Sequence, residues 1–269
     1  MYEKFYGLRE SPFNLTPDPR FLFFSHRHRE ALDHLLYGIH ERKGFIQITG
    51  EVGAGKTTLC RALLEQLGPR YKTALLLNPC MTSIQLLRAI LAELELDAKS
   101  RDRVRCLEIL NRFLLEQVTE GNDVVLVIDE AQDLSPLLLE EIRLLSNLET
   151  DQRKLLQIVL LGQPELREKL DKKSLRQLRQ RITVRYHLEP LTKTETEQYL
   201  HHRLRVAGAN GRPTFNRWAV GRIFRYSHGI PRLINAVADK TLLCGFVTGT
   251  DELRLGHVRR AIRELEGHF

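Results

Sequence analysis

The chain has 269 residues, of which 42% are hydrophobic and 28% are charged. This is the composition of an ordinary globular protein, and it excludes a collagen-like or disordered chain. Lysine and arginine outnumber aspartate and glutamate by 41 to 34, and the net charge of +7 allows an anionic partner such as nucleic acid without requiring one.

The N-terminal end gives no sign of export. Residues 1–6 lack the basic leader and the apolar core of a signal peptide. The longest apolar runs, such as Val124 to Ile128, are far shorter than the roughly 20 residues that cross a bilayer. Four cysteines are widely spaced, without metal-site spacing, and are expected to be reduced. We therefore expect a cytoplasmic chain with no membrane span.

Short β-rich runs alternate with amphipathic segments along the first two thirds of the chain. The runs are apolar almost throughout, which is typical of strands covered on both faces by helices. They lie at 45–49, 73–77, 124–128, 158–161 and 184–188. This alternation predicts an α/β fold with a parallel sheet.

After Leu191 the β signal stops, and the sequence predicts helices only. Thr192 opens a capping box with Glu195, and Ser135-Pro136 marks an earlier helix start. The four expected helices cover 192–206, 215–227, 231–246 and 251–266. Trp218 and Phe224 lie at about helical spacing and are expected in the core. We expect two domains: an α/β domain at 1–190, which includes an N-terminal extension, and a helical domain at 191–269.

A phosphate-binding loop is the strongest motif in the chain. Residues 50–57 match G-x-x-x-x-G-K-[ST], directly after one expected strand and before an amphipathic segment. Lys56 is predicted to reach the β and γ phosphates of ATP, and the Thr57 hydroxyl to bind Mg²⁺. The residues expected to bind the nucleotide are Gly50, Glu51, Val52, Gly53, Ala54, Gly55, Lys56, Thr57 and Thr58.

Two acids follow the apolar run 124–128. Buried charge at the end of a strand is costly unless it has a function. Asp129 is predicted to hold Mg²⁺, and Glu130 to orient and deprotonate the attacking water. Taken alone, such a pair is a weak sign, but together with the phosphate-binding loop it predicts a nucleotide hydrolase.

Further polar residues are candidates for the same nucleotide site. Gln163 closes the next apolar run and is a candidate sensor of the γ-phosphate, or else a solvated loop amide. Among Arg176, Arg179 and Arg181 one is expected to act as an arginine finger in a neighbouring subunit, unless the segment is merely a solvated basic helix. Arg232, after Gly229-Ile230-Pro231, is expected to face the nucleotide, and a capping turn with a solvent-exposed arginine is the alternative.

Together these motifs resemble the AAA+ ATPases, and the resemblance covers nearly the whole chain. Within them, the chain is similar to the general secretion pathway protein A (ExeA) group, which includes ATPases of pilus biogenesis and exopolysaccharide clusters. The segments that carry this resemblance are FYGLRESPFNLTPDPRFL at 5–22, HREAL at 28–32, LYGI at 36–39, DEAQDL at 129–134 and LGQPEL at 161–166.

The resemblance implies a P-loop fold with a five-stranded parallel sheet and a C-terminal helical lid. It also implies ATP and Mg²⁺ as ligands, a homo-oligomer with active sites shared between subunits, and a function in the cell envelope at the inner membrane. Secretion members continue into a membrane helix and a peptidoglycan-binding region and work with a protein B partner. This chain ends at Phe269, so we expect either the ATPase portion of a longer protein or a short member.

The N-terminal extension is a candidate for holding adenine. The candidates for an apolar slot that holds the adenine ring are Phe13, Asn14 and Leu15. Plain packing is an equally good interpretation of these side chains.

A DNA-binding ATPase of the transposition target-selection type would share every motif above. In its favour are the net charge and seven arginines between His201 and Arg232, a segment without acidic residues. Against it, no recognition helix or aromatic stacking platform is apparent. Envelope assembly is the preferred interpretation.

Overall fold

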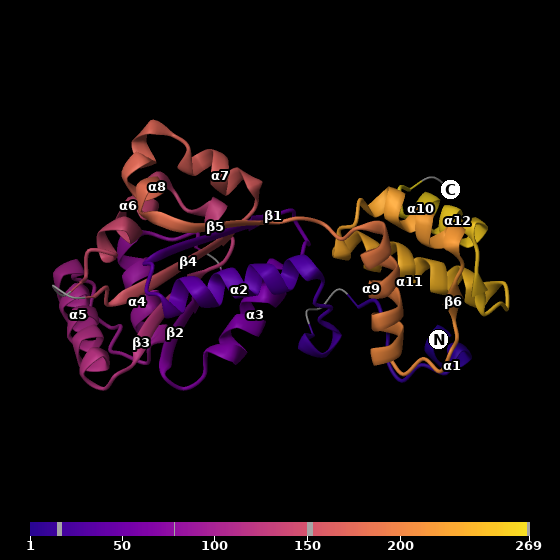
Figure 1. The fold of residues 1–269 in the computed structure, drawn as a ribbon, viewed down its shortest axis with the longest axis horizontal. Helices are drawn as coiled ribbons and strands as arrows, with labels where there is room; N and C mark the ends of the chain where they lie inside the picture. Colours follow the sequence, from indigo (N-terminus) through magenta and orange to yellow (C-terminus); the bar gives the residue numbers. More distant parts are fainter. Residues whose placement is uncertain (15–17, 78, 150–152, 268–269) are drawn as a thin grey trace. The chain divides into compact units, whose positions relative to one another are not determined.

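The computed structural model describes residues 1–14, 18–77, 79–149 and 153–267 (Figure 1). Contacts between residues divide the chain into two compact units. The sheet unit contains residues 27–50 and 59–188, and the helical unit contains residues 1–26, 51–58 and 189–269.

Five parallel strands form the centre of the sheet unit, in the spatial order β2-β3-β4-β1-β5. In chain order they are β1 (Phe45–Gly50), β2 (Tyr71–Leu76), β3 (Asp123–Ile128), β4 (Leu156–Gly162) and β5 (Ile182–Leu188). Every residue of β1 and β4 is buried, whereas the edge strands β2 and β5 mix buried and exposed residues. The predicted parallel α/β sheet of five strands is confirmed.

Helices cover both faces of this sheet. They are α2 (His26–His40), α3 (Lys56–Leu67), α4 (Ser83–Glu93), α5 (Arg103–Thr119), α6 (Pro136–Leu145), α7 (Pro164–Leu170) and α8 (Arg176–Arg181), with short 3-10 turns η2 (Ala131–Asp133) and η3 (Lys173–Leu175). In Figure 1, α2 and α3 lie on one face and α6, α7 and α8 on the other. On the α2 face, a Cβ at Gly38 would lie 2.6 Å from Ile46 Cδ1, so the helix packs closely on β1.

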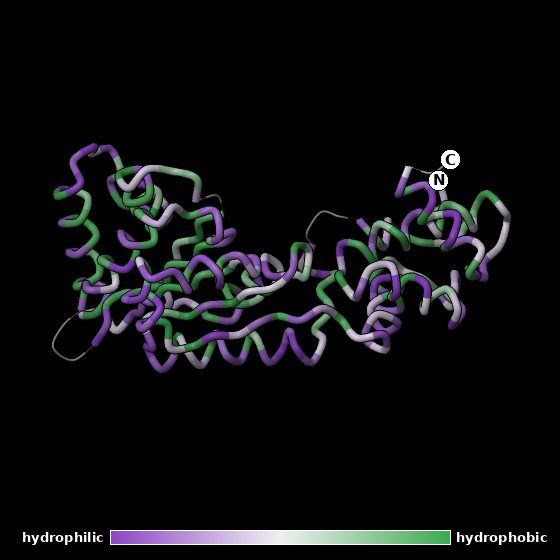
Figure 2. The backbone as a smooth tube through the Cα atoms, turned by 90° about the horizontal axis from the view of Figure 1, so that it is seen from above, coloured by the Kyte–Doolittle hydropathy of each residue, from purple (hydrophilic) through white to green (hydrophobic). Residues whose placement is uncertain are grey.

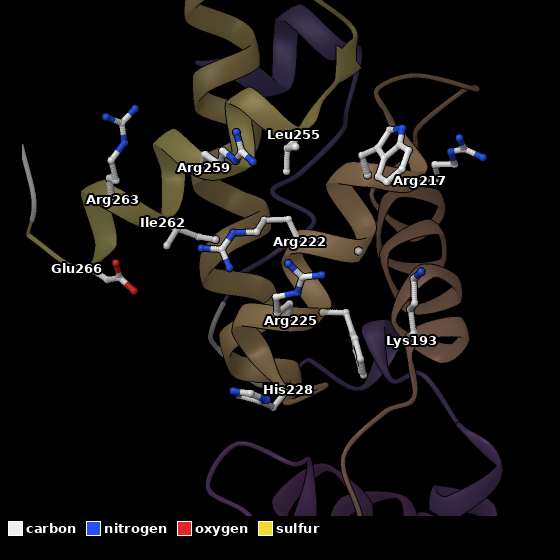
Figure 3. Close-up of a pocket in the computed structure, with 13 residues that line it drawn as sticks. Lys193, Arg217, Arg222, Arg225, His228, Leu255, Arg259, Ile262, Arg263 and Glu266 are labelled. Atoms are coloured by element: carbon white, nitrogen blue, oxygen red, sulfur yellow. The ribbon is translucent and has the colours of Figure 1, made fainter.

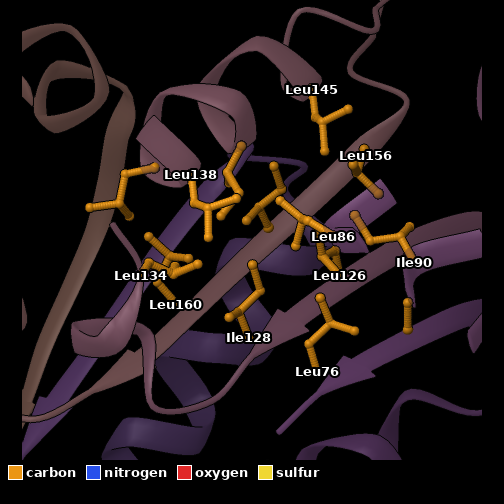
Figure 4. Close-up of a cluster of buried hydrophobic side chains, with 14 of the residues drawn as sticks. Leu76, Leu86, Ile90, Leu126, Ile128, Leu134, Leu138, Leu145, Leu156 and Leu160 are labelled. Carbon is orange, nitrogen blue, oxygen red and sulfur yellow. The ribbon is translucent and has the colours of Figure 1, made fainter. Parts of the chain in front are cut away.

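The core on the α4 and α6 face consists of aliphatic side chains. Leu86 and Ile90 of α4 and Leu138 of α6 pack with Leu126 and Ile128 of β3 (Figure 4). Each fully buried side chain of this kind contributes about 1.5–3 kcal/mol through the hydrophobic effect. This packing holds the carboxyl end of β3 in place.

The helical unit contains α1 (Tyr2–Tyr6), η1 (Pro19–Phe21), α9 (Lys193–Val206), α10 (Arg217–Ser227), α11 (Pro231–Val247) and α12 (Leu255–Leu265). The last four match the helices expected from the sequence. The structure adds a parallel pair of two-residue strands, β6 (Thr214–Phe215) and β7 (Glu252–Leu253). Two residues are too few to produce a recognisable alternation, and for this reason the prediction of helices alone was wrong there.

The N-terminal segment packs inside the helical unit. Tyr6 is 1% exposed, and its hydroxyl donates to the Leu242 carbonyl at 3.0 Å. Phe13 packs edge-on against Phe215, with ring centroids 6.2 Å apart. From the sequence, residues 1–26 are expected in the α/β domain, whereas the structure groups them with the helical part. The boundary after residue 190 stays a prediction.

Hydrophilic and hydrophobic residues alternate along the helices of both units (Figure 2). In α10 the buried stripe contains Val220 and Ile223, and Trp218 lies outside it with 62% of its surface exposed. The expectation that Trp218 belongs to the core is therefore wrong. Within the described ranges, no helix has the length and apolar character needed to cross a membrane.

Candidate active site

The loop between β1 and α3 curls in the manner that phosphate binding needs. Gly53 and Gly55 have φ values of 77° and 102°, in the left-handed region that favours glycine. The Ala54 N–H donates to the Glu51 carbonyl at 3.1 Å, which closes the turn. Because α3 begins at Lys56, the N–H groups of its first turn have no carbonyl of a preceding helical turn to bond, and they lie at the end of the loop. Such a helix start attracts phosphate.

Lys56 is buried at the start of α3. It is 5% exposed, and its Nζ donates to the Glu51 carbonyl at 3.0 Å. A buried ammonium group has three N–H donors and is costly unless they are satisfied. Phosphate oxygens are suited to this donor set, so the loop fits a nucleoside triphosphate. Thr57 and Thr58, the next two residues of α3, are half-buried.

The start of α11 lies against this loop within the helical unit. The Arg232 N–H donates to the Gly53 carbonyl at 3.4 Å. A Cβ at Gly53 would lie 2.5 Å from the Arg232 Cβ, so glycine is required for close approach as well as for its φ value. Pro231 occupies the first position of α11, as predicted. The sensing role of Arg232 stays a prediction, supported by this proximity.

In the sheet unit, β1, β3 and β4 are parallel, so their carboxyl ends share one edge. Gly50 ends β1, Asp129 follows β3 and Gln163 follows β4. Asp129 is 2% exposed. Its N–H donates to the Leu76 carbonyl at 2.8 Å, and its Oδ1 accepts from the Glu130 N–H at 2.9 Å. The carboxylate is thus held in one orientation at this edge.

Glu130 is held by two amide side chains. Its Oε2 accepts from Gln132 Nε2 at 2.7 Å and from Gln163 Nε2 at 3.1 Å. The Gln163 N–H in turn donates to Gln132 Oε1 at 3.0 Å. The structure therefore brings Glu130 and Gln163 together, and their network includes Gln132.

Sequence reasoning missed Gln132 and Lys169. The Lys169 ammonium group donates to the carbonyls of Gln132 and Leu134, the latter at 2.8 Å, and so fixes the turn η2. Gln132 was part of the DEAQDL segment, but no pattern indicated that its amide reaches Glu130. In the structure, a Cβ at Gly162 would lie 2.8 Å from Leu166 Cδ2 and 3.1 Å from Gln132 Oε1, so the glycine leaves room for both side chains.

The three arginines of α8 differ in their partners. Arg181 Nη1 donates to Ser146 Oγ at 2.6 Å and to the Arg143 carbonyl at 3.4 Å. Arg179 pairs with Asp171 at 3.2 Å. Arg176 is exposed, and in the described part of the chain its side chain has no hydrogen-bond or ion-pair partner.

The adenine candidates lie in the helical unit, except that Leu15 falls outside the described residues. Phe13 is 2% exposed and belongs to the hydrophobic core. The Asn14 carbonyl accepts from Arg203 Nη2 at 3.0 Å, and the Pro12 carbonyl accepts from Arg203 Nε at 2.5 Å. These contacts favour packing for the segment, and adenine binding stays a prediction. Arg203, 7% exposed, is unavailable to DNA.

Few metal ligands come together here. The described residues include no group of three or more His, Cys, Asp or Glu side chains that could hold a metal. Magnesium keeps several waters and takes one or two protein ligands plus phosphate oxygens. A hydroxyl at Thr57 and a carboxylate at Asp129 have the oxygen chemistry that Mg²⁺ prefers. Their role as ligands stays a prediction.

Known proteins resemble the chain at both the sequence and the fold level. A family model described as an AAA domain matches residues 39–170. General secretion pathway protein A of Aeromonas hydrophila is 45% identical over 268 residues, which cover 99% of this chain and 49% of that protein. The chain thus spans about half the length of this curated relative.

Solved structures share the fold at low identity. Cdc6p from Pyrobaculum aerophilum superposes with a TM-score of 0.69 and 18% identity, over 94% of this chain and 70% of that one. The Aeropyrum pernix ORC1 protein, solved in complex with DNA, superposes with a TM-score of 0.67 and 17% identity, over 96% of this chain and 70% of that one. With its five-stranded parallel sheet and its phosphate-binding loop, the chain belongs to the P-loop AAA+ proteins, in the general secretion pathway protein A group.

Proposed function

We propose that the chain hydrolyses ATP to ADP and phosphate with Mg²⁺. The observation that carries the proposal is the Glu130 carboxylate, positioned by the amides of Gln132 and Gln163 at the carboxyl edge of the sheet. A carboxylate fixed in this way is suited to accept a proton from water.

The residue roles follow from the chemistry of each group. Lys56 and the N–H groups of residues 51–58 hold the phosphates, and Thr57 and Asp129 hold Mg²⁺, which offsets phosphate charge when bound. Glu130 takes a proton from water as the water oxygen bonds to the γ-phosphorus and the bond to the ADP oxygen breaks. Gln163 links Glu130 to the state of the γ-phosphate, and Arg232 links that state to the helical lid.

We further propose that hydrolysis requires a homo-oligomer. Arg176 is the α8 arginine without a partner in the described chain, so it is available to a neighbouring subunit. A cation supplied in this way stabilises negative charge in the transition state and makes turnover depend on assembly.

The relative's name supports a role in the cell envelope. We propose that the ATPase drives or switches assembly of a secretion, pilus or polysaccharide-export machine, from the cytoplasmic side of the inner membrane. A membrane protein of the general secretion pathway protein B type would be its partner. This part rests on similarity to a protein that is twice as long.

The test of hydrolysis is the Glu130→Gln variant. It should bind ATP and Mg²⁺ normally, and its turnover should fall by roughly 10²–10⁴-fold, because the water loses its base. Glu168→Gln, at an exposed position of α7, is the matched control and should keep wild-type turnover. Near-normal turnover of Glu130→Gln would refute the proposed base.

The alternative function, target selection for DNA transposition, uses the same ATPase residues. Turnover measured with and without duplex DNA at two salt concentrations separates the two. Salt-sensitive stimulation by the duplex would favour the transposition type, and turnover that is indifferent to the duplex favours the envelope role.

A further inference from the structure

A groove in the helical unit gathers cations around an exposed aromatic side chain. It has a volume of about 970 Å³ and is lined by residues of α10 and α12 and by the first residue of α9 (Figure 3). Glu266 is the one acid among its lining residues. The cations that line it are Lys193, Arg217, Arg222, Arg225, Arg259 and Arg263.

These six side chains have no counter-ions among the described residues. Across the described residues none of them makes a hydrogen bond or an ion pair, although Arg217 stacks over Trp218 at 4.7 Å from the ring centroid. Nearby arginines outside the groove are paired: Arg254 with Glu252 at 2.6 Å and Arg260 with Glu264 at 3.1 Å. Like charges closer than a Debye length, about 8 Å at physiological salt, repel one another. A polyanion in the groove would relieve this repulsion.

The cations lie in the middle of the groove as well as at its border. In Figure 3, Arg222 and Arg225 occupy the centre of the lining, with Ile262 and Arg263 on one side and Lys193 on the other. The apolar face of a partner helix would bury these guanidinium groups without acceptors, which is costly. A chain of phosphates supplies acceptors at the centre, and arginine binds phosphate through paired N–H groups.

The exposed Trp218 side chain favours a single strand over a duplex as the ligand of the groove. It is 62% exposed and lines the groove together with the half-buried Phe224. The bases of a single strand are free to stack on such a side chain, which contributes about 1–3 kcal/mol per base. In a duplex the bases are stacked on one another and are not available.

We propose that this groove binds single-stranded nucleic acid, with phosphates on the six cations and a base on Trp218. The site belongs wholly to the helical unit and uses none of the residues assigned to ATP hydrolysis. Nucleic-acid binding at the groove can therefore be tested independently of the proposed ATPase activity.

The chain carries its own reporter for this test, because Trp218 is its single tryptophan. Titration of the full chain with a thirty-nucleotide oligodeoxythymidine should quench Trp218 fluorescence saturably at low salt. The slope of log K against log salt concentration should approach about −4 if all six cations contact phosphates, at about −0.7 per contact. No saturable quenching would overturn the proposal.

Two neighbouring arginines of α12 give a matched pair of variants. Arg259 lines the groove and Arg260 does not, and each change to glutamine removes one charge. With fluorescein-labelled oligonucleotide, Arg259→Gln should weaken binding several-fold and reduce the salt slope by about 0.7. Arg260→Gln should stay within about twofold of wild type. Equal losses in both variants would show general charge attraction and overturn the groove assignment.

Variants at Trp218 and two competitor ligands complete the test. Trp218→Phe should bind the labelled strand nearly as well as wild type, and Trp218→Ala should lose roughly 5- to 150-fold in affinity, as expected for one stacked base. A thirty-base-pair duplex and a glutamate thirty-mer should bind more weakly than the single strand. Tighter binding of the duplex, or of the acidic peptide as a stand-in for an acidic protein partner, would contradict the proposal.

Discussion

Glu130 combines an unusual backbone with a fixed side chain. Its φ of 50° lies in the left-handed region, which costs a residue other than glycine on the order of 1–3 kcal/mol. Each hydrogen bond to its charged carboxylate contributes about 1.5–3 kcal/mol. The amides of Gln132 and Gln163 therefore offset the backbone cost, and they fix where the carboxylate points. On the proposed mechanism, loss of either amide leaves the base misplaced.

Gln132→Ala tests this at a residue that does not need to touch ATP. The change removes one donor to Glu130 and leaves the Gln163 N–H without its acceptor. We expect kcat to fall roughly 10- to 150-fold, equivalent to one hydrogen bond to a charged group of about 1.5–3 kcal/mol, with KM for ATP within about twofold. Steady-state kinetics measure both constants.

A double-mutant cycle checks the network itself. Gln163→Ala should lower kcat similarly, and the double variant should lose less than the product of the two single losses, because both amides act through Glu130. Gln180→Ala, an exposed amide of α8, should leave both constants unchanged. Independent, multiplicative losses would show that Gln132 and Gln163 do not act through one carboxylate.

At the scale of elements, Arg203 joins the N-terminal segment to α9. Its guanidinium donates to the carbonyls of Pro12 and Asn14 and lies 4.5 Å from the centroid of the Phe21 ring. Burial lowers the pKa of Arg203. A buried cation that satisfies backbone carbonyls is costly to truncate, because the carbonyls are left without donors.

Arg203→Met should destabilise the helical unit by about 3 kcal/mol, the usual range for breaking a buried charged contact being about 3–5 kcal/mol. Denaturant unfolding and limited proteolysis near residues 9–14 measure the effect. Arg205→Met is the control, since Arg205 is exposed two residues further along the same helix, and it should change stability by less than about 0.5 kcal/mol. An Arg203→Met variant as stable as the control would remove the proposed link.

Elements that follow local rules were predictable from sequence. The strands of the sheet are apolar runs because helices bury both faces, so their positions were evident. The capping box at Thr192 and Glu195 forms with bonds of 2.9 and 3.2 Å, and Ser135 caps α6 ahead of Pro136. In these cases the residues that determine the structure are close together in the sequence.

Features that depend on distant contacts could not be predicted. Helical spacing alone does not say which face of α10 is buried, so Trp218 was misplaced. Arg203 looked like one surface arginine of a basic segment, and its partners lie near residue 13, about 190 positions away. Gln132 lies in a short turn without periodicity, and its contact with Gln163 depends on the neighbouring strands β3 and β4.

At the scale of the whole molecule, the arginines of α8 bear on assembly. Arg179 and Arg181 already bind groups of their own chain, whereas Arg176 is exposed and has no partner in the described part. In a ring with head-to-tail contacts, each active site would combine Glu130 of one subunit with Arg176 of the next. Turnover per subunit should then rise with protein concentration over the assembly range.

Mixing two inactive variants tests the shared site directly. Arg176→Ala should lose turnover by at least about 10³-fold, as expected for an arginine finger, while ATP binding is retained. Glu130→Gln is inactive for lack of its base. In a one-to-one mixture, an intact site needs the Arg176→Ala subunit to supply Glu130 and the Glu130→Gln subunit to supply Arg176. Random assembly gives this arrangement at about one contact in four.

The mixture should therefore recover about a quarter of wild-type turnover, far above either variant alone, if sites act independently. A smaller but clear gain would show that an intact site is slowed by its inactive neighbours, and it would still require a shared site. Arg179→Ala is the control: it should remain active by itself, because Arg179 has its partner in Asp171 of the same chain. A mixture no more active than its components would contradict Arg176 as the finger of independently acting sites, since such sites are completed wherever the two variants meet in the right order.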